Sequence, residues 1–247
     1  MEFTEKVLRK IKINSVVHVG AHLGQEVSNY KFYGISKIVL FEPQQYFYNI
    51  LSNKFKNDNQ IKIFNVALGN KNKITKINIS NNDGASSSLL TPKKHLEVYP
   101  EIDFKTEETV QVKKMSDFNF TDFDLLVVDT QGYELNVLEG CEDLLRNFKY
   151  LIIEINLKEL YEGCPTVKNL DDYLTKYNFI RIKTSIHSKK FFGDALYVQS
   201  MKFNALQNYF YSLKASFFIS NFYTLWINTV HLDYWKELYK NLKLIKN

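Results

Sequence analysis

Residues 16–26 read "VVHVGAHLGQE", a short β-branched run followed by a turn with glycines at positions 20 and 24. The run is typical of a buried strand in a parallel sheet, and the residues after it have the length of a helix. Glycines at such a turn let the backbone approach a ligand closely. Because two glycines after a strand are a weak signal alone, the flanking segments decide what the turn holds.

Strand-like and helix-like segments alternate after this turn. Four more short apolar runs are typical of strands covered on both faces: "KIVLFEP" (37–43), "IKIFNVALG" (61–69), "FDLLVVDT" (123–130) and "YLIIEIN" (150–156). Stretches of helix length lie at 24–33, 44–56, 133–147 and 166–177. The alternation predicts a βαβ series, and therefore an α/β fold with a doubly wound, mostly parallel sheet.

Two segments depart from this alternation. Residues 70–118 contain "ITKINIS", the loop "NNDGASSSLLTPKKHLEVYPE" and "VQVKKM". An insertion of this length is uncommon in a compact domain unless it covers a site. After residue 178, "FIRIKTSI" and "FFGDALYVQ" are separated only by "HSKK", which predicts an antiparallel hairpin at one edge of the sheet.

The composition limits the class of protein. A chain of 247 residues suits one main domain with an appendage. The net charge is +5, but arginine occurs only at Arg9, Arg146 and Arg181, so we expect no nucleic-acid partner. Cys141 and Cys164 form no metal-ligand or disulfide pattern. The charged N-terminus does not resemble a signal peptide, and we expect a cytoplasmic protein.

The last part of the chain differs from the rest. Residues 200–247 are rich in aromatics and carry no Lys, Arg, Asp or Glu between Lys214 and Asp233, yet they are too polar for a membrane span. We therefore expect a domain of residues 1–199 and a helical C-terminal extension of residues 200–247. The extension is expected to pack on the core or on a second copy of the chain. In the second case the protein would be a homodimer. A wall over the substrate and peripheral attachment to a membrane are the alternatives.

Ligands in a doubly wound sheet bind beyond the carboxyl ends of the strands. Glu42 lies about 20 residues after the turn, the offset at which a carboxylate commonly binds a ribose diol. His22 stands where the dinucleotide fingerprint GxGxxG would need a further glycine. The pattern therefore indicates a nucleoside-containing cofactor and argues against a dinucleotide oxidoreductase.

Seven sequence blocks occur in a characteristic order: "VGAHLGQE", "LFEPQ", "NVALG", "GASSSLL", "VVDTQGYELNVLEG", "IIEIN…ELYEG" and "GDALYV". Over residues 14–199 they resemble the FkbM family of S-adenosylmethionine-dependent methyltransferases, most specifically in "DTQGYELNVLEG" and "GDALYV". The resemblance implies a Rossmann-like class I methyltransferase fold with a seven-stranded sheet. It also implies O-methylation with S-adenosylmethionine as cofactor, often of a sugar hydroxyl in a glycan, glycolipid or secondary metabolite.

The resemblance places the methionine and ribose portions of S-adenosylmethionine in the turn. The candidate cofactor residues are His18, Gly20, His22, Gly24, Glu42, Asn65, Ala67 and Asp129. The family usually has Asp where this chain has His18, and a neutral imidazole would not attract an ammonium group as a carboxylate does. For His18 the structural alternative is a strand histidine bonded to a backbone carbonyl, and for Asn65 and Ala67 it is an ordinary turn.

Methyl transfer to a hydroxyl requires alignment of the reacting groups, and a base or a metal ion would help. The candidate bases are Asp129, His95 and Glu154. The structural alternative is a helix cap for Asp129 and an ordinary loop histidine for His95. For Glu154 it is an ion pair with a buried lysine. Glu134 is expected to stabilise a helix N-terminus through the helix dipole.

Oxygen ligands at neighbouring strand ends raise a second possibility. Asp129, Glu154 and Asn156 could hold Mg²⁺, an option that we do not favour because such groupings are common in this fold class. The candidate substrate residues are Ser86, Ser87, Ser88 and Gln131, and for the serines a solvated loop is the alternative. A non-catalytic binding or scaffold protein that retains the fold remains the alternative function, because a fold does not determine an activity.

Overall fold

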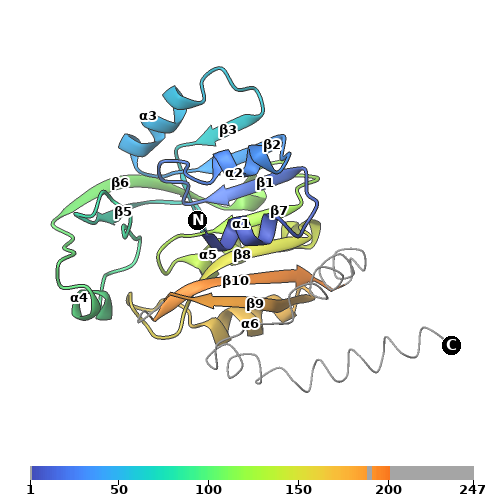
Figure 1. Cartoon of the computed structure of the whole chain (residues 1–247). Helices are drawn as coiled ribbons and strands as arrows, with labels where there is room; N and C mark the ends of the chain where they lie inside the picture. The colour runs from blue at the N-terminus through green and yellow to red at the C-terminus, as the bar shows by residue number, and fades with distance from the viewer. Residues whose placement is uncertain (1, 188–190, 201–247) are drawn as a thin grey trace. The chain divides into compact units, whose positions relative to one another are not determined.

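A computed structural model describes residues 2–187 and 191–200 of the chain. Apart from its first residue, the predicted helical extension of residues 200–247 lies outside the described residues, so its structure and role stay predictions. Figure 1 shows that the described part is built around one large sheet, with helices packed against it and a smaller sheet beside it.

The large sheet has seven strands in the order β3-β2-β1-β7-β8-β10-β9. Five strands are parallel: β1 (Ser15–Val19), β2 (Lys37–Phe41), β3 (Ile61–Phe64), β7 (Leu125–Val128) and β8 (Tyr150–Asn156). The hairpin of β9 (Phe179–Ile186) and β10 (Phe192–Gln199) is antiparallel and forms one edge. The predicted fold class is confirmed. Every residue of β1 and β8 is buried, which explains their largely apolar sequence.

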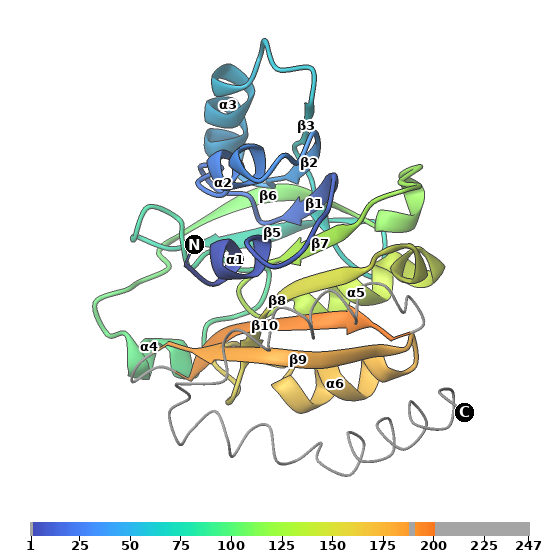
Figure 2. The same ribbon diagram turned by 45° about the vertical axis from the view of Figure 1, so that its right-hand side comes forward.

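Helices cover both faces of this sheet. Figure 2 shows α5 (Glu134–Cys141) and α6 (Val167–Thr175) on one face and α1 (Glu2–Leu8) on the other. The helices α2 (Val27–Phe32) and α3 (Gln45–Lys54) follow β1 and β2. The helix predicted over residues 133–147 is divided into two parts. The α-helix ends at Cys141, and a 3₁₀ helix, η2 (Glu142–Asn147), follows because Glu142 has a φ of 50°, which interrupts the α-helical path.

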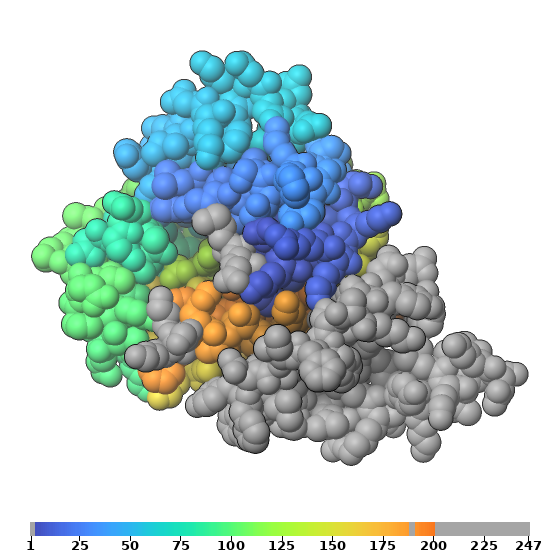
Figure 3. Space-filling view, viewed as in Figure 1, coloured from blue at the N-terminus to red at the C-terminus, as the bar shows by residue number. Residues whose placement is uncertain are grey.

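The insertion of residues 70–118 forms most of the second sheet. Its strands β5 (Lys73–Ile79) and β6 (Thr106–Lys113) are antiparallel, and β6 also pairs with the short β4 (Ala67–Leu68). Between β5 and β6 lies the helix α4 (Lys94–Val98), and the 3₁₀ helix η1 (Met115–Asp117) follows β6. In the space-filling view of Figure 3, the teal-to-green surface of the insertion lies beside the orange β9–β10 hairpin.

Backbone hydrogen bonds fix the insertion over the carboxyl end of the large sheet. The amides of Lys93 and His95 donate to the carbonyl of Leu160, at 3.0 and 2.9 Å, and the amide of Glu162 donates to Thr91 at 2.8 Å. The loop after β8 therefore holds α4 in place. Within the described part of the chain, no helix has the length and apolar character needed to cross a membrane.

Candidate active site

The carboxyl ends of the parallel strands border two neighbouring cavities. The first, here named the turn cavity, has a volume of about 300 Å³ and is lined by Gly20, Glu42 and Ala67, among others. The second, named the acidic cavity, has a volume of about 410 Å³, and its lining includes Glu154. Asp129 and Gln131 line both cavities, so these two residues lie where the cavities meet.

The turn after β1 brings two strands into close contact. Gly20 has a φ of +85°, and a Cβ atom there would lie 1.8 Å from the carbonyl oxygen of Asp129. A larger residue would therefore separate the ends of β1 and β7 at the cavity wall. Gly24 also has a positive φ, +65°, but its neighbour is the side chain of Leu51 on α3. Gly24 lines neither cavity and packs against α3.

Glu42 presents a buried carboxylate at the end of β2. One oxygen accepts the backbone N–H of His22 at 2.8 Å, and the other accepts that of Gln44 at 2.9 Å. Burial raises the pKa of Glu42 to about 7, although these two hydrogen bonds act in the opposite direction. Each carboxylate oxygen has more than one acceptor position, so Glu42 can order the turn and still accept hydrogen bonds from a ligand.

Both histidines of the turn line the turn cavity. His18 is buried, and its Nδ1 is paired with the hydroxyl of Tyr30 at 3.0 Å, so the predicted bond to a backbone carbonyl is wrong. Burial lowers the pKa of His18 and favours the neutral ring. The ring of His22 donates from Nε2 to the carbonyl of Asp83 at 2.7 Å and packs on Phe47. His22 therefore links the turn to the insertion.

The end of β3 supports the site indirectly. Asn65 donates from Nδ2 to the carbonyls of Glu42 and Pro43, at 3.1 and 3.0 Å, and lines neither cavity. These bonds hold the chain after β2. Ala67, at the start of β4, does line the turn cavity, together with Val66. These residues belong to an apolar part of the wall.

Gln131 joins two carboxylates at the junction. Its Nε2 donates to Oδ1 of Asp129 at 2.8 Å and to the oxygens of Glu154 at 3.1 and 3.2 Å. Burial raises the pKa of Asp129 to about 6, and the negative charge of Asp194 adds to this effect. The pKa of Glu154 is also raised, first by burial and then by the charges of Asp129, Glu134 and Asp194.

The partners of Asp129 and Glu154 differ from both structural alternatives. No side-chain cap bond is found at the N-terminus of α5, so Asp129 is not its cap. Glu154 is bonded to an amide and not to a lysine. Both carboxylates therefore face the cavities without a cationic partner among the bonds described for them.

Glu134 is more important than the dipole argument predicts. Its Oε1 accepts the backbone N–H groups of Thr130 and Gly132, both at 3.0 Å, and so fixes the turn that carries Gln131. Its Oε2 is buried without a hydrogen-bond partner in the described structure. Burial raises the pKa of Glu134 to about 7.

The three candidate serines have separate positions. Ser87 lines the turn cavity and Ser86 lines the acidic cavity, whereas Ser88 lines neither. The hydroxyl of Ser88 donates to the carbonyl of Gln131 at 2.7 Å, so it holds the insertion against the junction. All three are buried, and the solvated-loop alternative is therefore wrong.

Two further polar side chains lie in the wall of the acidic cavity. His95, only 3% exposed, and Asn156, only 2% exposed, both line it. Within the described structure, Nδ1 of His95 and Nδ2 of Asn156 have no hydrogen-bond partner. Burial lowers the pKa of His95, which favours the neutral imidazole. Buried polar atoms of this kind are normally satisfied, and these two are placed where a ligand could satisfy them.

Among the described residues, no group of three or more His, Cys, Asp or Glu side chains is arranged to hold a metal ion.

Two acidic residues of the cavity walls lie in recognised sequence blocks but were missed by sequence reasoning. Glu26 ends the opening turn sequence and lines the turn cavity. Asp194 lies in "GDALYV" and is the cross-strand partner of Glu154. Their presence in the recognised sequence blocks was the available signal, but only the register of β8 and β10 shows that Asp194 is next to Glu154.

Comparisons with known proteins agree with this geometry. The sequence model of the Methyltransferase FkbM domain matches residues 18–181. The chain is 27% identical over 131 residues to the 2-O-methyltransferase NoeI of Sinorhizobium fredii (strain NBRC 101917 / NGR234), a match that covers 49% of this chain and 54% of NoeI. The chain thus spans about half the length of this curated relative.

Solved structures with a similar fold include a methyltransferase FkbM from Methylobacillus flagellatus KT. It has a TM-score of 0.53 and 14% identity, with coverage of 76% of this chain and 44% of that chain. TrmK of M. capricolum in complex with S-adenosyl-homocysteine has a TM-score of 0.46 and 13% identity, with coverage of 81% and 69%. The family's sequence model matches more than half of the residues of this chain, and the chain therefore belongs to the FkbM methyltransferase family.

Proposed function

We propose that this protein is an S-adenosylmethionine-dependent O-methyltransferase and that its acceptor is a sugar hydroxyl. The observation that carries the proposal is the junction of the two cavities. Asp129 and Gln131 line both, so a methyl donor in the turn cavity and an acceptor in the acidic cavity would meet beside a carboxylate. When bound, S-adenosylmethionine supplies a sulfonium methyl group that an acceptor oxygen displaces in line.

The walls of the turn cavity suit the different parts of this cofactor. Val66, Leu68 and Leu89 form an apolar wall that suits a purine base. The carboxylate of Glu42 lies in the same cavity and offers hydrogen-bond acceptors to a ribose diol. Gly20 has no side chain, and its backbone packs closely against the carbonyl oxygen of Asp129. No side chain at position 20 therefore occupies the space beside Asp129.

Glu26 compensates for the histidine at position 18. The neutral ring of His18 cannot attract an ammonium group, and its Nδ1 is already paired with Tyr30. Glu26 lines the turn cavity on the same turn, and its charge acts on His18. We assign to Glu26 the attraction of the cofactor's amino group, a task that needs an anion but not a particular strand position.

Asp129 fits the role of base better than His95 does. Asp129 lines both cavities, whereas His95 lines only the acidic cavity. A pKa of about 6 leaves Asp129 largely ionised at neutral pH and makes it a stronger base than a carboxylate with an ordinary pKa. Asp129 accepts the hydroxyl proton as the new oxygen–carbon bond forms, while Gln131 holds its carboxylate in position.

The acidic cavity has the chemistry of a polyol site. Asp129 and Glu154 offer hydrogen-bond acceptors to hydroxyl groups, and Asn156 offers an amide donor that has no partner in the described structure. The rings of Tyr161 and Phe192 also line the cavity and provide apolar faces for a sugar ring. The name 2-O-methyltransferase of the relative NoeI supports oxygen as the methylated atom.

Calorimetric titration of the protein with S-adenosylhomocysteine, and separately with NAD, tests the cofactor. We expect the first ligand to bind and the second not to. Methyl transfer from labelled S-adenosylmethionine to a panel of monosaccharides then tests the acceptor class. The non-catalytic alternative predicts that neither cofactor binds, and this result would overturn the proposed function.

A further inference from the structure

Three carboxylates from neighbouring strands meet in the acidic cavity. Asp129 follows β7, Glu154 lies on β8 and Asp194 lies on β10, and all three line the cavity. Glu154 and Asp194 are directly opposite each other in the antiparallel β8–β10 pair. Like charges at such positions destabilise a sheet. The arrangement therefore has a cost that the fold alone does not require.

The described surroundings only partly compensate this negative charge. The neutral amide of Gln131 donates to both Asp129 and Glu154, and the ring of His187 lies 3.5 Å from an oxygen of Asp194. No lysine or arginine occurs among the described residues that line the cavity. Burial, and after it the negative charges of neighbouring residues, raise the pKa of Glu154, as expected when no strong cation is close.

The unpartnered atoms of His95 and Asn156 independently indicate a ligand. Both side chains are at least nine-tenths buried, both line this cavity, and neither Nδ1 of His95 nor Nδ2 of Asn156 has a partner within the described residues. A buried polar atom without a hydrogen bond lowers the stability of the folded state. A polar ligand that reaches both atoms recovers this energy.

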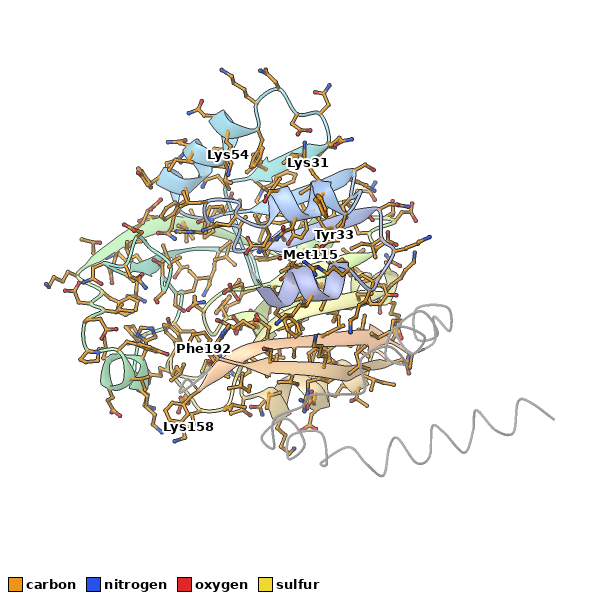
Figure 4. All side chains as sticks on the ribbon, in the orientation of Figure 1. Lys31, Tyr33, Lys54, Met115, Lys158 and Phe192 are labelled. Atoms are coloured by element: carbon orange, nitrogen blue, oxygen red, sulfur yellow. The ribbon has the colours of Figure 1, made fainter. Side chains whose placement is uncertain are left out.

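Aromatic rings complete the wall. The ring of His95 lies 5.2 Å from that of Tyr161 and 5.1 Å from that of Tyr99, and the ring of Tyr99 lies 6.4 Å from that of Phe192, as measured between centroids. Figure 4 labels Phe192 at the end of the β9–β10 hairpin that lies toward α4. Aromatic faces attract cations and also contact the apolar faces of sugar rings.

We propose that the acceptor carries a protonated amine near the hydroxyl that is methylated, as in an amino sugar whose nitrogen is not acylated. This inference rests on the proposed function. Asp194 and Glu154 hold the ammonium group between the two strands, and Asp129 remains available to the reacting hydroxyl. His95 and Asn156 bind other polar atoms of the acceptor. A cationic acceptor explains why several carboxylates line the cavity. A neutral polyol would need only hydrogen-bond donors and acceptors, whether charged or neutral.

Binding of three simple sugars tests this proposal on the unchanged full-length protein. The protein is saturated with S-adenosylhomocysteine and titrated calorimetrically with D-glucosamine, D-glucose and N-acetyl-D-glucosamine, at low salt and at a pH where the amine is protonated. We expect D-glucosamine to bind at least about tenfold more tightly than the two neutral sugars, because a hydrogen bond between charged groups is stronger than a neutral one. Added salt is expected to reduce this preference.

Two variants locate the effect. Asp194→Asn removes one charge and keeps the shape of the side chain, and we expect it to abolish the preference for D-glucosamine. Asp172→Asn makes the same change on an exposed carboxylate of α6, which is paired with Lys168, and we expect the preference to remain.

The outcomes separate this inference from the proposed function. If S-adenosylhomocysteine binds but D-glucosamine does not, or binds no better than D-glucose, the cationic acceptor is wrong and the methyltransferase activity stands. If S-adenosylhomocysteine itself does not bind, both proposals fail. The comparison of the three sugars uses the wild-type protein, so it does not depend on the folding of any variant.

Discussion

Glu42 has two tasks that a single substitution can separate. Its oxygens accept the amides of His22 and Gln44, and it also lines the turn cavity. Glu42→Gln keeps the size of the side chain but turns one acceptor into a donor that faces a backbone N–H. We expect the affinity for S-adenosylhomocysteine, measured by calorimetry, to fall by about tenfold or more.

Glu108 provides a matched control for Glu42. Glu108 also accepts a backbone N–H through its carboxylate, that of Gln45 at 2.8 Å, but it does not line the turn cavity. Glu108→Gln should therefore leave the affinity for S-adenosylhomocysteine close to that of the wild type. Equal losses in the two variants would show that Glu42 acts only through the backbone.

Asp129 is expected to control the pH dependence of methyl transfer. Asp129→Asn removes the base and should reduce kcat by about 10²–10⁴-fold. In the wild type, kcat should rise with pH and level off above about 6, because the pKa of Asp129 is raised to about that value. The Asn variant should lose this dependence. If His95→Ala loses it and Asp129→Asn keeps it, the base is His95.

The positions of Glu42 and Asp129 could be predicted from the sequence because both end a continuous apolar run, and such runs end at the same edge of a parallel sheet. Asp194 could not be predicted, because its proximity to Glu154 depends on the register of two antiparallel strands. Asn65 and Ser88 were assigned to the site from their position in the sequence. Their hydrogen bonds show that they support it from outside the cavities.

At the scale of elements, α5 contacts the loop after β4 with almost no space between them. A Cβ atom on Gly140 of α5 would lie 1.9 Å from the carbonyl oxygen of Gly69. Gly140→Ala must push α5 away from this backbone, and α5 follows the turn that carries Asp129 and Gln131. We expect the variant to lose about 1–3 kcal/mol of folding stability through overpacking, measured by denaturant unfolding.

Gly34→Ala is the control for this packing effect. Gly34 has a φ of +80°, but no atom lies within 4 Å of the added Cβ, so only backbone strain of about 1 kcal/mol is expected. Because Gly34 makes no such contact, its variant should lose less stability than Gly140→Ala in the same unfolding experiment. A Gly140→Ala variant as stable as the wild type would contradict the close contact.

The strands of the large sheet were predictable because each is a local apolar run. The arrangement of the insertion was not, because α4 is held by backbone bonds from Lys93 and His95 to Leu160, more than 60 residues away. Local sequence contains no information on such pairs. The end of α5 at Cys141 was missed for a similar reason, since apolar periodicity continues through residues 142–147 while the backbone at Glu142 changes conformation.

At the scale of the whole molecule, the site concentrates carboxylates whose pKa values are raised. Burial raises the pKa of Glu42 and of Glu134 to about 7 and that of Asp129 to about 6, and the pKa of Glu154 is raised as well. In the unfolded chain these groups lose their protons near the ordinary values of 3.8 to 4.5. Between these values and about 7, the folded state binds more protons than the unfolded state.

The ligand-free protein should therefore become less stable as the pH rises from about 5 to about 7, since stability falls wherever the folded state holds the extra protons. Thermal unfolding at a series of pH values measures this, and we expect Tm to fall by several degrees, at about 2–4 °C per kcal/mol. Glu134→Gln removes one titrating group and keeps an oxygen for the amides of Thr130 and Gly132, so its Tm should depend less steeply on pH. A wild-type Tm that rises over this range would mean that these carboxylates are ionised in the folded protein and compensated by a cation.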